Sequence, residues 1–129
     1  PLIQSIETQN TLQICMGLYN ILRALAFLHE KASVSHNNLC ESSIYVTPEG
    51  CWKLGGLECL CKFKDLTTSY LQKIRTYRYE KAISFNEDTT APTSFTTIDV
   101  YAFGILAENI LRSKDPGKRY IINLNCTPF

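Results

Sequence analysis

The stretch His36–Glu58, HNNLCESSIYVTPEGCWKLGGLE, decides the fold that we expect for this chain. Residues 44–46 (IYV) and 52–54 (WKL) are short runs of the kind that favour β-strands. Residues 47–50 (TPEG) lie between them and carry the proline and glycine that are typical of a tight turn. The stretch therefore predicts a β-hairpin with polar loops on both sides.

A long helix is expected before this stretch. Apolar residues recur between residues 14 and 28, mostly at spacings of three and four, which places them on one face of an α-helix. Asn10 or Thr11 can serve as its N-cap. Core packing alone explains this pattern, so the helix indicates no chemistry. The apolar positions are Ile14, Leu18, Ile21, Leu22, Leu25 and Leu28.

A second helix is expected over residues 98–112, with Thr96 and Thr97 as capping residues. Its sequence is apolar on nearly every side, which is typical of a buried helix. Asp99 lies in the first turn, where the helix macrodipole favours a negative charge. Burying a carboxylate without partners is costly, so we expect hydrogen-bond donors around Asp99.

Composition limits the class of protein. A chain of 129 residues with 45% hydrophobic content is long enough for one domain with a modest core. With 19% charged residues and a net charge of +1, the chain lacks the charge excess of nucleic-acid-binding or membrane-surface proteins. Its uninterrupted apolar runs are shorter than about 20 residues, so no transmembrane segment is predicted. No signal-peptide pattern opens the chain.

The sequence contains six cysteines. Cys15 falls in the first helical pattern, Cys40 falls in a loop, and Cys59 and Cys61 are separated by one residue. Reduced thiols are the expected state, because no secretory signal is present. Cys59 and Cys61 match half of a zinc site, but no second Cys or His pair follows at ligand spacing, so no metal is predicted.

The order of these features resembles the catalytic centre of a eukaryotic protein kinase. In kinases, a helix leads to a loop written H-R-D-L-x-x-x-N, and a hairpin separates this loop from D-F-G. Here the helix ends in FLH (27–29), the loop keeps His36 and Leu39, and residues 99–104 (DVYAFG) are similar to the family's D-V-W-S-x-G. The resemblance covers residues 11–112. The combination of SHNNL, SSIYV and WKLGGLE is similar to the Scy-like pseudokinases, especially their ezrin-binding member.

The resemblance implies that the groups needed for phosphoryl transfer are replaced. Asn38 stands in place of the loop aspartate, and a neutral amide cannot accept the substrate proton as a carboxylate does. Ser43 replaces one magnesium ligand of the family and Gly56 replaces another, while Cys40 replaces a phosphate-contacting lysine. We therefore expect no catalytic residue, no metal and no cofactor, although Glu58 is close enough in sequence to Gly56 to reach a metal.

The resemblance also implies structural roles. His36 and Leu57 occupy positions where kinases stack an apolar spine. Asp99 corresponds to an aspartate that accepts hydrogen bonds from backbone amides of the loop that begins at the histidine. Tyr45 lies at the floor of the adenine pocket, where its size is expected to occlude nucleotide. Glu87 lies near the position of the family's A-P-E glutamate, although its neighbours do not match.

Fold class and domain boundaries follow from the same resemblance. Residues 1–112 are expected to form part of the C-terminal, larger lobe of a kinase-like α+β domain, mainly helical with a small β-hairpin. The lobe is expected to be truncated, and the missing initial Met indicates a fragment. Residues 113–129 do not follow the family. Because Gly117 and Lys118 can be encoded by GGT-AAG, the start of a typical intron, this tail is interpreted as read-through into non-coding sequence.

Residues 62–94 form a long polar segment without clear periodicity, at the place of a kinase activation segment. Such a stretch inside a domain is typical of a functional or mobile loop. Its tyrosines, Tyr70, Tyr77 and Tyr79, are interpreted as half-buried packing residues rather than phosphorylation sites.

Three interpretations of function remain open. The leading one is a catalytically inactive module that serves as a protein-interaction scaffold. The resemblance implies an ezrin-type cytoskeletal adaptor or a trafficking coat as partner, with roles in cytoskeletal adhesion and migration or in Golgi and vesicle trafficking. It also implies a cytoplasmic location, peripheral to the Golgi or at the cell edge. The second interpretation is an atypical kinase or ATP-binding regulator with degenerate metal ligands. The third is a truncated gene product without activity of its own.

Overall fold

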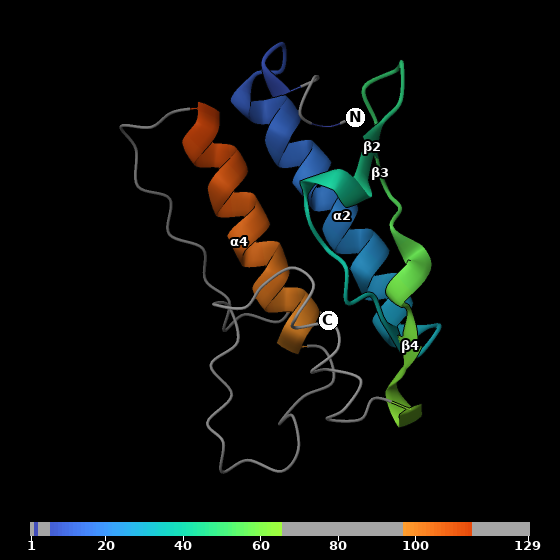
Figure 1. Cartoon of the computed structure of the whole chain (residues 1–129). Helices are drawn as coiled ribbons and strands as arrows, with labels where there is room; N and C mark the ends of the chain where they lie inside the picture. The colour runs from blue at the N-terminus through green and yellow to red at the C-terminus, as the bar shows by residue number, and fades with distance from the viewer. Residues whose placement is uncertain (1, 3–5, 66–96, 115–129) are drawn as a thin grey trace.

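The computed structural model describes residue 2, residues 6–65 and residues 97–114. Two long helices, α2 (Thr11–Glu30) and α4 (Thr97–Lys114), lie side by side, and a β-hairpin packs on α2 (Figure 1). The predicted mainly helical architecture with a small antiparallel hairpin is confirmed. The shorter elements are β1 (Val34–Ser35), η1 (Glu41–Ser43), β2 (Ile44–Val46), β3 (Trp52–Leu54), η2 (Leu57–Cys59), β4 (Cys61–Lys62) and η3 (Phe63–Asp65), where η marks a 3₁₀ helix.

Helix α2 begins at Thr11 with a reciprocal capping box. The Asn10 side chain accepts a hydrogen bond of 2.8 Å from the Gln13 backbone N–H, and the Gln13 side chain accepts one of 2.9 Å from the Asn10 N–H. These bonds satisfy backbone donors that the first helical turn leaves free. Of the two capping residues that the sequence allows, Asn10 is therefore the N-cap. The buried residues of α2 are Ile14, Gly17, Leu18, Ile21, Leu25 and His29.

Strands β2 and β3 form the predicted hairpin. They pair antiparallel, with Tyr45 opposite Lys53. The turn is closed by a hydrogen bond of 2.9 Å from the Thr47 N–H to the Cys51 carbonyl. Gly50 has a φ of 86°, a left-handed conformation that glycine adopts without steric cost. The glycine of the predicted turn is therefore required by its backbone conformation.

Trp52 anchors the hairpin to α2. Its side chain is 2% exposed, and its indole lies so close to Gly17 that a Cβ added there would be 2.1 Å from a ring carbon. The indole Nε1–H donates a hydrogen bond of 3.2 Å to the side-chain oxygen of Gln9. The contact between helix and hairpin therefore depends on the absence of a side chain at position 17.

A second two-stranded sheet holds the loop that begins at His36. Strand β1 pairs antiparallel with β4, with Val34 opposite Lys62 and Ser35 opposite Cys61. The residue pattern does not predict this pair, since Lys62 begins the segment that is expected to be a polar loop. Strands of two residues are too short to show the alternation by which a strand is recognised in a sequence.

Helix α4 buries one face rather than nearly every side, which corrects the sequence prediction. Leu106 and Ile110 are 1% and 2% exposed. On the solvent side, Glu108 and Arg112 form an ion pair of 2.5 Å between residues four apart, and Tyr101 is 38% exposed. The solvent side of α4 is therefore partly polar, although the sequence predicts an apolar helix on nearly every side. The hydrophobic core comprises Leu2, Ile14, Leu18, Ile21, Leu25, Leu39, Ile44, Trp52, Ala102, Phe103, Leu106, Ala107, Ile110 and Leu111.

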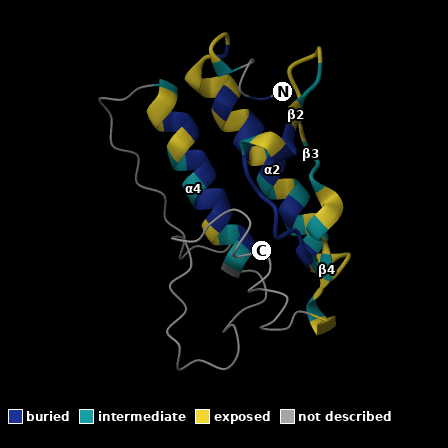
Figure 2. Ribbon diagram, in the orientation of Figure 1, coloured by how far each residue is buried: buried dark blue, intermediate teal, exposed yellow. Residues whose placement is uncertain are grey.

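The outer face of α2 is exposed (Figure 2), and several of its exposed residues are large and apolar. Leu12, Met16, Tyr19 and Phe27 are between 61% and 69% exposed. Since both faces of the helix carry apolar residues, α2 is long and apolar enough to cross a membrane. The length of the uninterrupted apolar runs in the sequence does not indicate this. Length and composition alone are weak evidence for a membrane span, because the core helix of a soluble protein can have both. Here α2 packs against α4 and β3.

Candidate functional site

Asp99 is the centre of a buried hydrogen-bond cluster. Its carboxylate is 1% exposed and accepts a hydrogen bond of 2.7 Å from the His36 N–H and one of 2.8 Å from the Asn37 N–H. The ring Nε2 of His29, at the end of α2, lies 2.7 Å from the same carboxylate. These donors offset the cost of burying the carboxylate. The contact that the resemblance implies, between Asp99 and the loop at His36, is therefore present.

His36 fixes the loop through both of its ring nitrogens. The side chain is fully buried, with Nε2 2.7 Å from the Gly55 carbonyl oxygen. Its Nδ1 accepts a hydrogen bond of 3.2 Å from the Asn38 N–H. Because a carbonyl only accepts and an N–H only donates, the two contacts require a neutral imidazole with its proton on Nε2. The ring therefore joins the loop to the end of the hairpin.

Asn37 extends this cluster to the β1–β4 sheet. Its φ of 64° is left-handed, a conformation that asparagine tolerates better than most residues. Its side-chain amide donates hydrogen bonds of 2.7 Å to the Ser35 hydroxyl and 3.0 Å to the Cys59 carbonyl. These roles of Asn37 and His29 are not predicted by the sequence pattern. The histidine of the FLH motif was the available signal for His29, and it served only to mark the end of the helix.

Asn38 contacts the segment that follows the hairpin. Its side-chain amide donates a hydrogen bond of 3.0 Å to the Gly56 carbonyl and one of 3.1 Å to the Glu58 carboxylate. An amide with both of these acceptors holds the loop in place but cannot take up a proton as a carboxylate would. Glu58 therefore lies against Asn38, a contact that its position in the sequence did not predict.

Ser43 and Cys40 lie beside Asn38 in the same loop. The Ser43 hydroxyl is 1% exposed and donates a hydrogen bond to the Asn38 carbonyl. The Cys40 sulfur lies 3.3 Å from the same hydroxyl and 3.0 Å from that of Ser42. The structure thus brings the predicted positions 38, 40 and 43 together, with their polar atoms bonded to one another and to the backbone.

Gly56 is packed too tightly to accept a side chain. Its φ of 65° is left-handed. A Cβ placed there would lie 2.6 Å from the Ser43 hydroxyl oxygen and 2.9 Å from the Asn38 amide nitrogen. A side chain at position 56 would therefore require Ser43 and Asn38 to move. Gly56 therefore belongs to the same group as Asn38 and Ser43.

Leu57 lies at the surface in the described part of the chain, and its place in an apolar spine stays a prediction. Its side chain is 52% exposed, whereas His36 is fully buried. The left-handed conformation of Gly56 leads directly into η2, and no residue of η2 is buried. The ring nitrogens of His36 bond to polar groups of the backbone. An apolar spine through Leu57 is therefore absent from the described part of the chain.

Tyr45 lies on the hairpin strand above Gly55. Its ring packs so closely that a Cβ at Gly55 would be 2.4 Å from a ring carbon. The tyrosine is still 55% exposed. Occlusion of an adenine site by Tyr45 stays a prediction, which depends on whether nucleotide approaches this exposed ring face.

The cysteines of the described residues form no disulfide with one another: Cys15, Cys40, Cys51, Cys59 and Cys61. Burial raises the pKa of the Cys61 thiol, and the nearby Asp65 carboxylate adds to this shift. Within the ranges that the structure describes, no three His, Cys, Asp or Glu side chains gather as a metal site would require. Predictions on Tyr70, Tyr77, Tyr79, Glu87, Thr96 and residues 115–129 lie outside the described residues.

The chain is similar to several curated proteins. It is 38% identical over 116 residues to the mouse "Protein-associating with the carboxyl-terminal domain of ezrin", and this match covers 86% of this chain and 16% of the mouse protein. It is 39% identical over 59 residues to the Dictyostelium discoideum "Probable inactive serine/threonine-protein kinase scy1", covering 46% of this chain and 7% of the relative. It is 30% identical over 128 residues to the Schizosaccharomyces pombe "Protein kinase domain-containing protein ppk32", and this match covers 88% of this chain and 15% of the relative.

These relatives are far longer than the chain, which spans 16% or less of the length of each of the three. No family model matches the sequence. No solved structure matches it either. The relationship therefore rests on the curated relatives, two of which match over most of the chain.

Proposed function

We propose, since this chain belongs to the Scy-like family of protein-kinase-like proteins, that it acts as a catalytically inactive module for protein interactions. One relative carries a kinase domain in its name, and another is named as probably inactive. We assign residues 1–112 to the C-terminal lobe of the kinase-like domain and residues 113–129 to a tail outside the family pattern. The tail is the segment for which we propose an origin by read-through.

The observation that carries this proposal is the closed packing at Gly56. Phosphoryl transfer depends on metal ions that carboxylate and amide side chains hold against the phosphates. At position 56 there is no side chain, and a Cβ would meet Ser43 and Asn38 at less than 3.0 Å. The Asn38 amide occupies this space by donating to the Gly56 carbonyl. The geometry therefore supports a loop that keeps its backbone contacts but would have to rearrange to accept a metal-binding side chain at position 56.

The proposed role is that of a scaffold. The mouse relative is named for association with the carboxyl-terminal domain of ezrin. We propose an ezrin-type cytoskeletal adaptor as the partner, which would place the protein in adhesion and migration, in the cytoplasm or at the cell edge. A trafficking coat, with a location peripheral to the Golgi, is the alternative partner.

Glu58 favours a second candidate function, an ATP-binding regulator with degenerate metal ligands. Its carboxylate lies 3.1 Å from the Asn38 amide nitrogen, next to Gly56. A carboxylate in this place could hold one cation, although a single protein ligand is a weak site. Under this hypothesis Glu58→Gln lowers the affinity for ATP with Mg²⁺, and under the scaffold hypothesis it changes nothing.

A phosphotransfer assay tests the leading proposal. The purified chain, ATP, Mg²⁺ and a generic protein substrate are expected to give no transfer above background, with the same result for Asn38→Ala. Transfer by the unmodified chain that Asn38→Ala abolishes would contradict an inactive site. Calorimetric titration with the purified carboxyl-terminal domain of ezrin then tests the partner. Binding supports the adaptor role, and the absence of heat at micromolar concentrations rules that partner out.

A further inference from the structure

Four large apolar residues form a stripe along the exposed outer face of α2 (Figure 2). The stripe consists of Leu12, Met16, Tyr19 and Phe27, which are between 61% and 69% exposed. They follow one another at spacings of four, three and eight residues, which place them on one side of the helix. Together they present roughly 500 Å² of apolar surface, at the upper end of the largest patch on a typical monomer. A patch of this size indicates an interaction surface.

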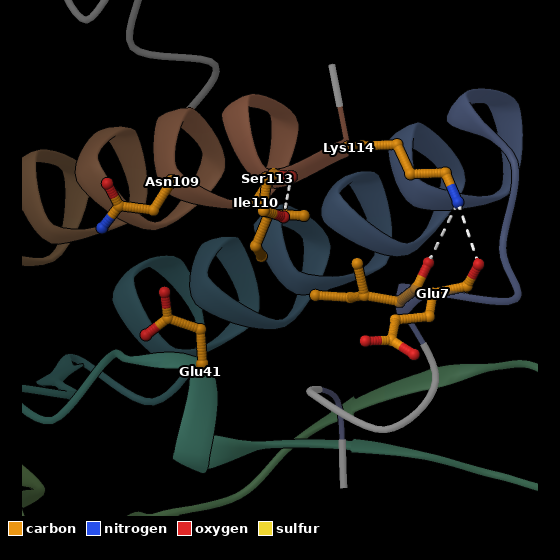
Figure 3. Close-up of a pocket in the computed structure, with 7 residues that line it drawn as sticks. Glu7, Glu41, Asn109, Ile110, Ser113 and Lys114 are labelled. Atoms are coloured by element: carbon orange, nitrogen blue, oxygen red, sulfur yellow. Dashed lines mark hydrogen bonds between the residues drawn. The ribbon is translucent and has the colours of Figure 1, made fainter. Parts of the chain in front are cut away.

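The opposite face of α2 is fixed inside the fold. The Lys114 ammonium, at the end of α4, donates hydrogen bonds of 3.3 Å to the Ile6 carbonyl and 3.2 Å to the Glu7 carbonyl, just before α2 (Figure 3). On the side of the hairpin, the Trp52 ring packs directly on Gly17. These contacts hold the helix in one orientation and keep the stripe at the surface of the described part of the chain.

Two charged residues lie on the same side of α2 as the stripe. Arg23 and Glu30 are exposed, and within the described ranges neither takes part in an ion pair. Glu30 is the last residue of the helix, where the macrodipole disfavours a negative charge. The first turn of α2, where the macrodipole favours a negative charge, contains no acidic residue. One end of the helix therefore carries the charge that the other end lacks.

We propose that the stripe binds a second copy of this chain, with the two α2 helices antiparallel about a two-fold axis. In this arrangement the C-terminal end of each helix lies beside the N-terminal end of the other. Each Glu30 then meets the first turn of the second copy's α2, where its charge is favourable. A parallel arrangement would instead bring the two Glu30 carboxylates together. The charges of α2 therefore favour an antiparallel copy of the same helix.

The side chains of the stripe fit one another in a register that sets Arg23 opposite Tyr19. A guanidinium stacks on an aromatic ring, and the two-fold axis makes this contact twice. In the same register Phe27 of one copy enters the gap between Leu12 and Met16 of the other, as a knob enters a hole. A standard interface buries about 800 Å² per partner, and the exposed polar residues beside the stripe supply the area that the stripe lacks.

Sedimentation velocity of the purified full chain over a range of micromolar concentrations tests the proposal. The expected result is a reversible equilibrium between monomer and dimer. Met16→Glu and Phe27→Glu are each expected to raise the dissociation constant of the dimer at least about tenfold, because each puts a charge into the apolar centre of the interface. Leu57→Glu, at an exposed apolar position of η2, is the matched control and is expected to leave the equilibrium unchanged. Circular dichroism checks that the variants keep their helix content.

Glu30→Lys tests the antiparallel arrangement. Within its own helix the new charge is favourable, but it is expected to weaken the dimer severalfold, because a cation then meets the N-terminal end of the second copy's helix. A chain that stays monomeric over the whole range overturns the proposal whatever the variants do. A dimer that both Met16→Glu and Phe27→Glu leave intact also overturns it, since its interface lies elsewhere. A monomeric chain that binds phosphatidylcholine vesicles would assign the stripe to a lipid surface instead.

Discussion

The Asp99 carboxylate, in the first turn of α4, lies 2.7 Å from the backbone nitrogen of His36, which is 63 residues earlier in the chain. The same carboxylate contacts the Asn37 N–H and the ring of His29. One buried side chain thus joins the end of α2, the loop and α4. Within the described residues, its partners are two backbone N–H groups and one imidazole ring.

Replacing Asp99 is expected to destabilise the fold. Asp99→Ala removes the acceptor for two buried backbone N–H groups, and we expect a loss of about 1–3 kcal/mol in the free energy of unfolding. Urea denaturation followed by Trp52 fluorescence measures it. Glu108→Ala, which removes an exposed ion pair of the same helix, is the control and should cost less than about 1 kcal/mol. Equal effects of the two changes would mean that the Asp99 contacts contribute little.

A side chain at position 56 is expected to destabilise the fold more than a side chain at position 50. Gly56→Ala and Gly50→Ala both place a side chain at a positive φ, but only position 56 has atoms within 4 Å of the new Cβ. The strain common to both is about 1–2 kcal/mol, and we expect Gly56→Ala to lose additional stability through the contacts with Ser43 and Asn38. The measurement is the difference between the two free energies of unfolding. A smaller loss at position 56 would contradict the closed packing.

The double variant Asn38→Asp with Gly56→Asp extends this prediction to function. It supplies two of the carboxylates that kinases use, but the backbone at position 56 cannot present one without displacing Ser43. We expect no phosphate transfer above the level of the unmodified chain. Transfer that appears in the double variant and is absent from the single variant Gly56→Asp, in which position 38 is again asparagine, would show that only the side chains were missing.

Gly17→Ala is expected to separate the hairpin from α2. The added methyl group would overlap the Trp52 ring at 2.1 Å, and overpacking of this kind costs about 1–3 kcal/mol. Cys15→Ala, at an exposed position of the same helix, is the control. Urea denaturation and the emission wavelength of Trp52 give the readout. Unchanged stability and emission in Gly17→Ala would place the indole elsewhere.

Cys61 is expected to react with iodoacetamide more slowly than the exposed Cys51. Burial and Asp65 raise the pKa of the Cys61 thiol, so at pH 8 a smaller fraction of it is thiolate, the reactive form. As the pH rises through this raised pKa, the thiolate fraction grows and the difference in rate should narrow. Site-specific mass spectrometry of the alkylated chain follows both rates. Faster alkylation of Cys61 than of Cys51 at pH 8 would contradict the shift.

The sequence was sufficient for the parts of the fold that have strong local signals. The heptad-like spacing from Ile14 to Leu28 predicts α2, and the TPEG turn predicts the hairpin. The contact between Asp99 and the loop followed from the family resemblance and from the cost of burying a carboxylate. In each case the residue pattern and the structure have the same physical cause, the burial of apolar or charged groups.

Other features depend on backbone geometry that the residue types do not specify. Strands β1 and β4 have two residues each and show no pattern. Leu57 begins η2 directly after Gly56, whose left-handed conformation the residue types alone do not specify. The hydrogen bond between Asn38 and Glu58 depends on the same turn. Such contacts follow from the path of the backbone, which the sequence pattern does not show.

The most direct test of the central claim, that this kinase-like centre does not hold nucleotide with metal, is a thermal-shift titration with ATP and Mg²⁺. Ligand at about 100 times its dissociation constant adds about 2.7 kcal/mol to stability, which is a clearly visible shift. We predict no shift for the unmodified chain at millimolar ATP with Mg²⁺, and a shift in Tyr45→Leu only if the tyrosine is what blocks the adenine position. A saturable rise in melting temperature of the unmodified chain, lost in Glu58→Gln, would contradict the account.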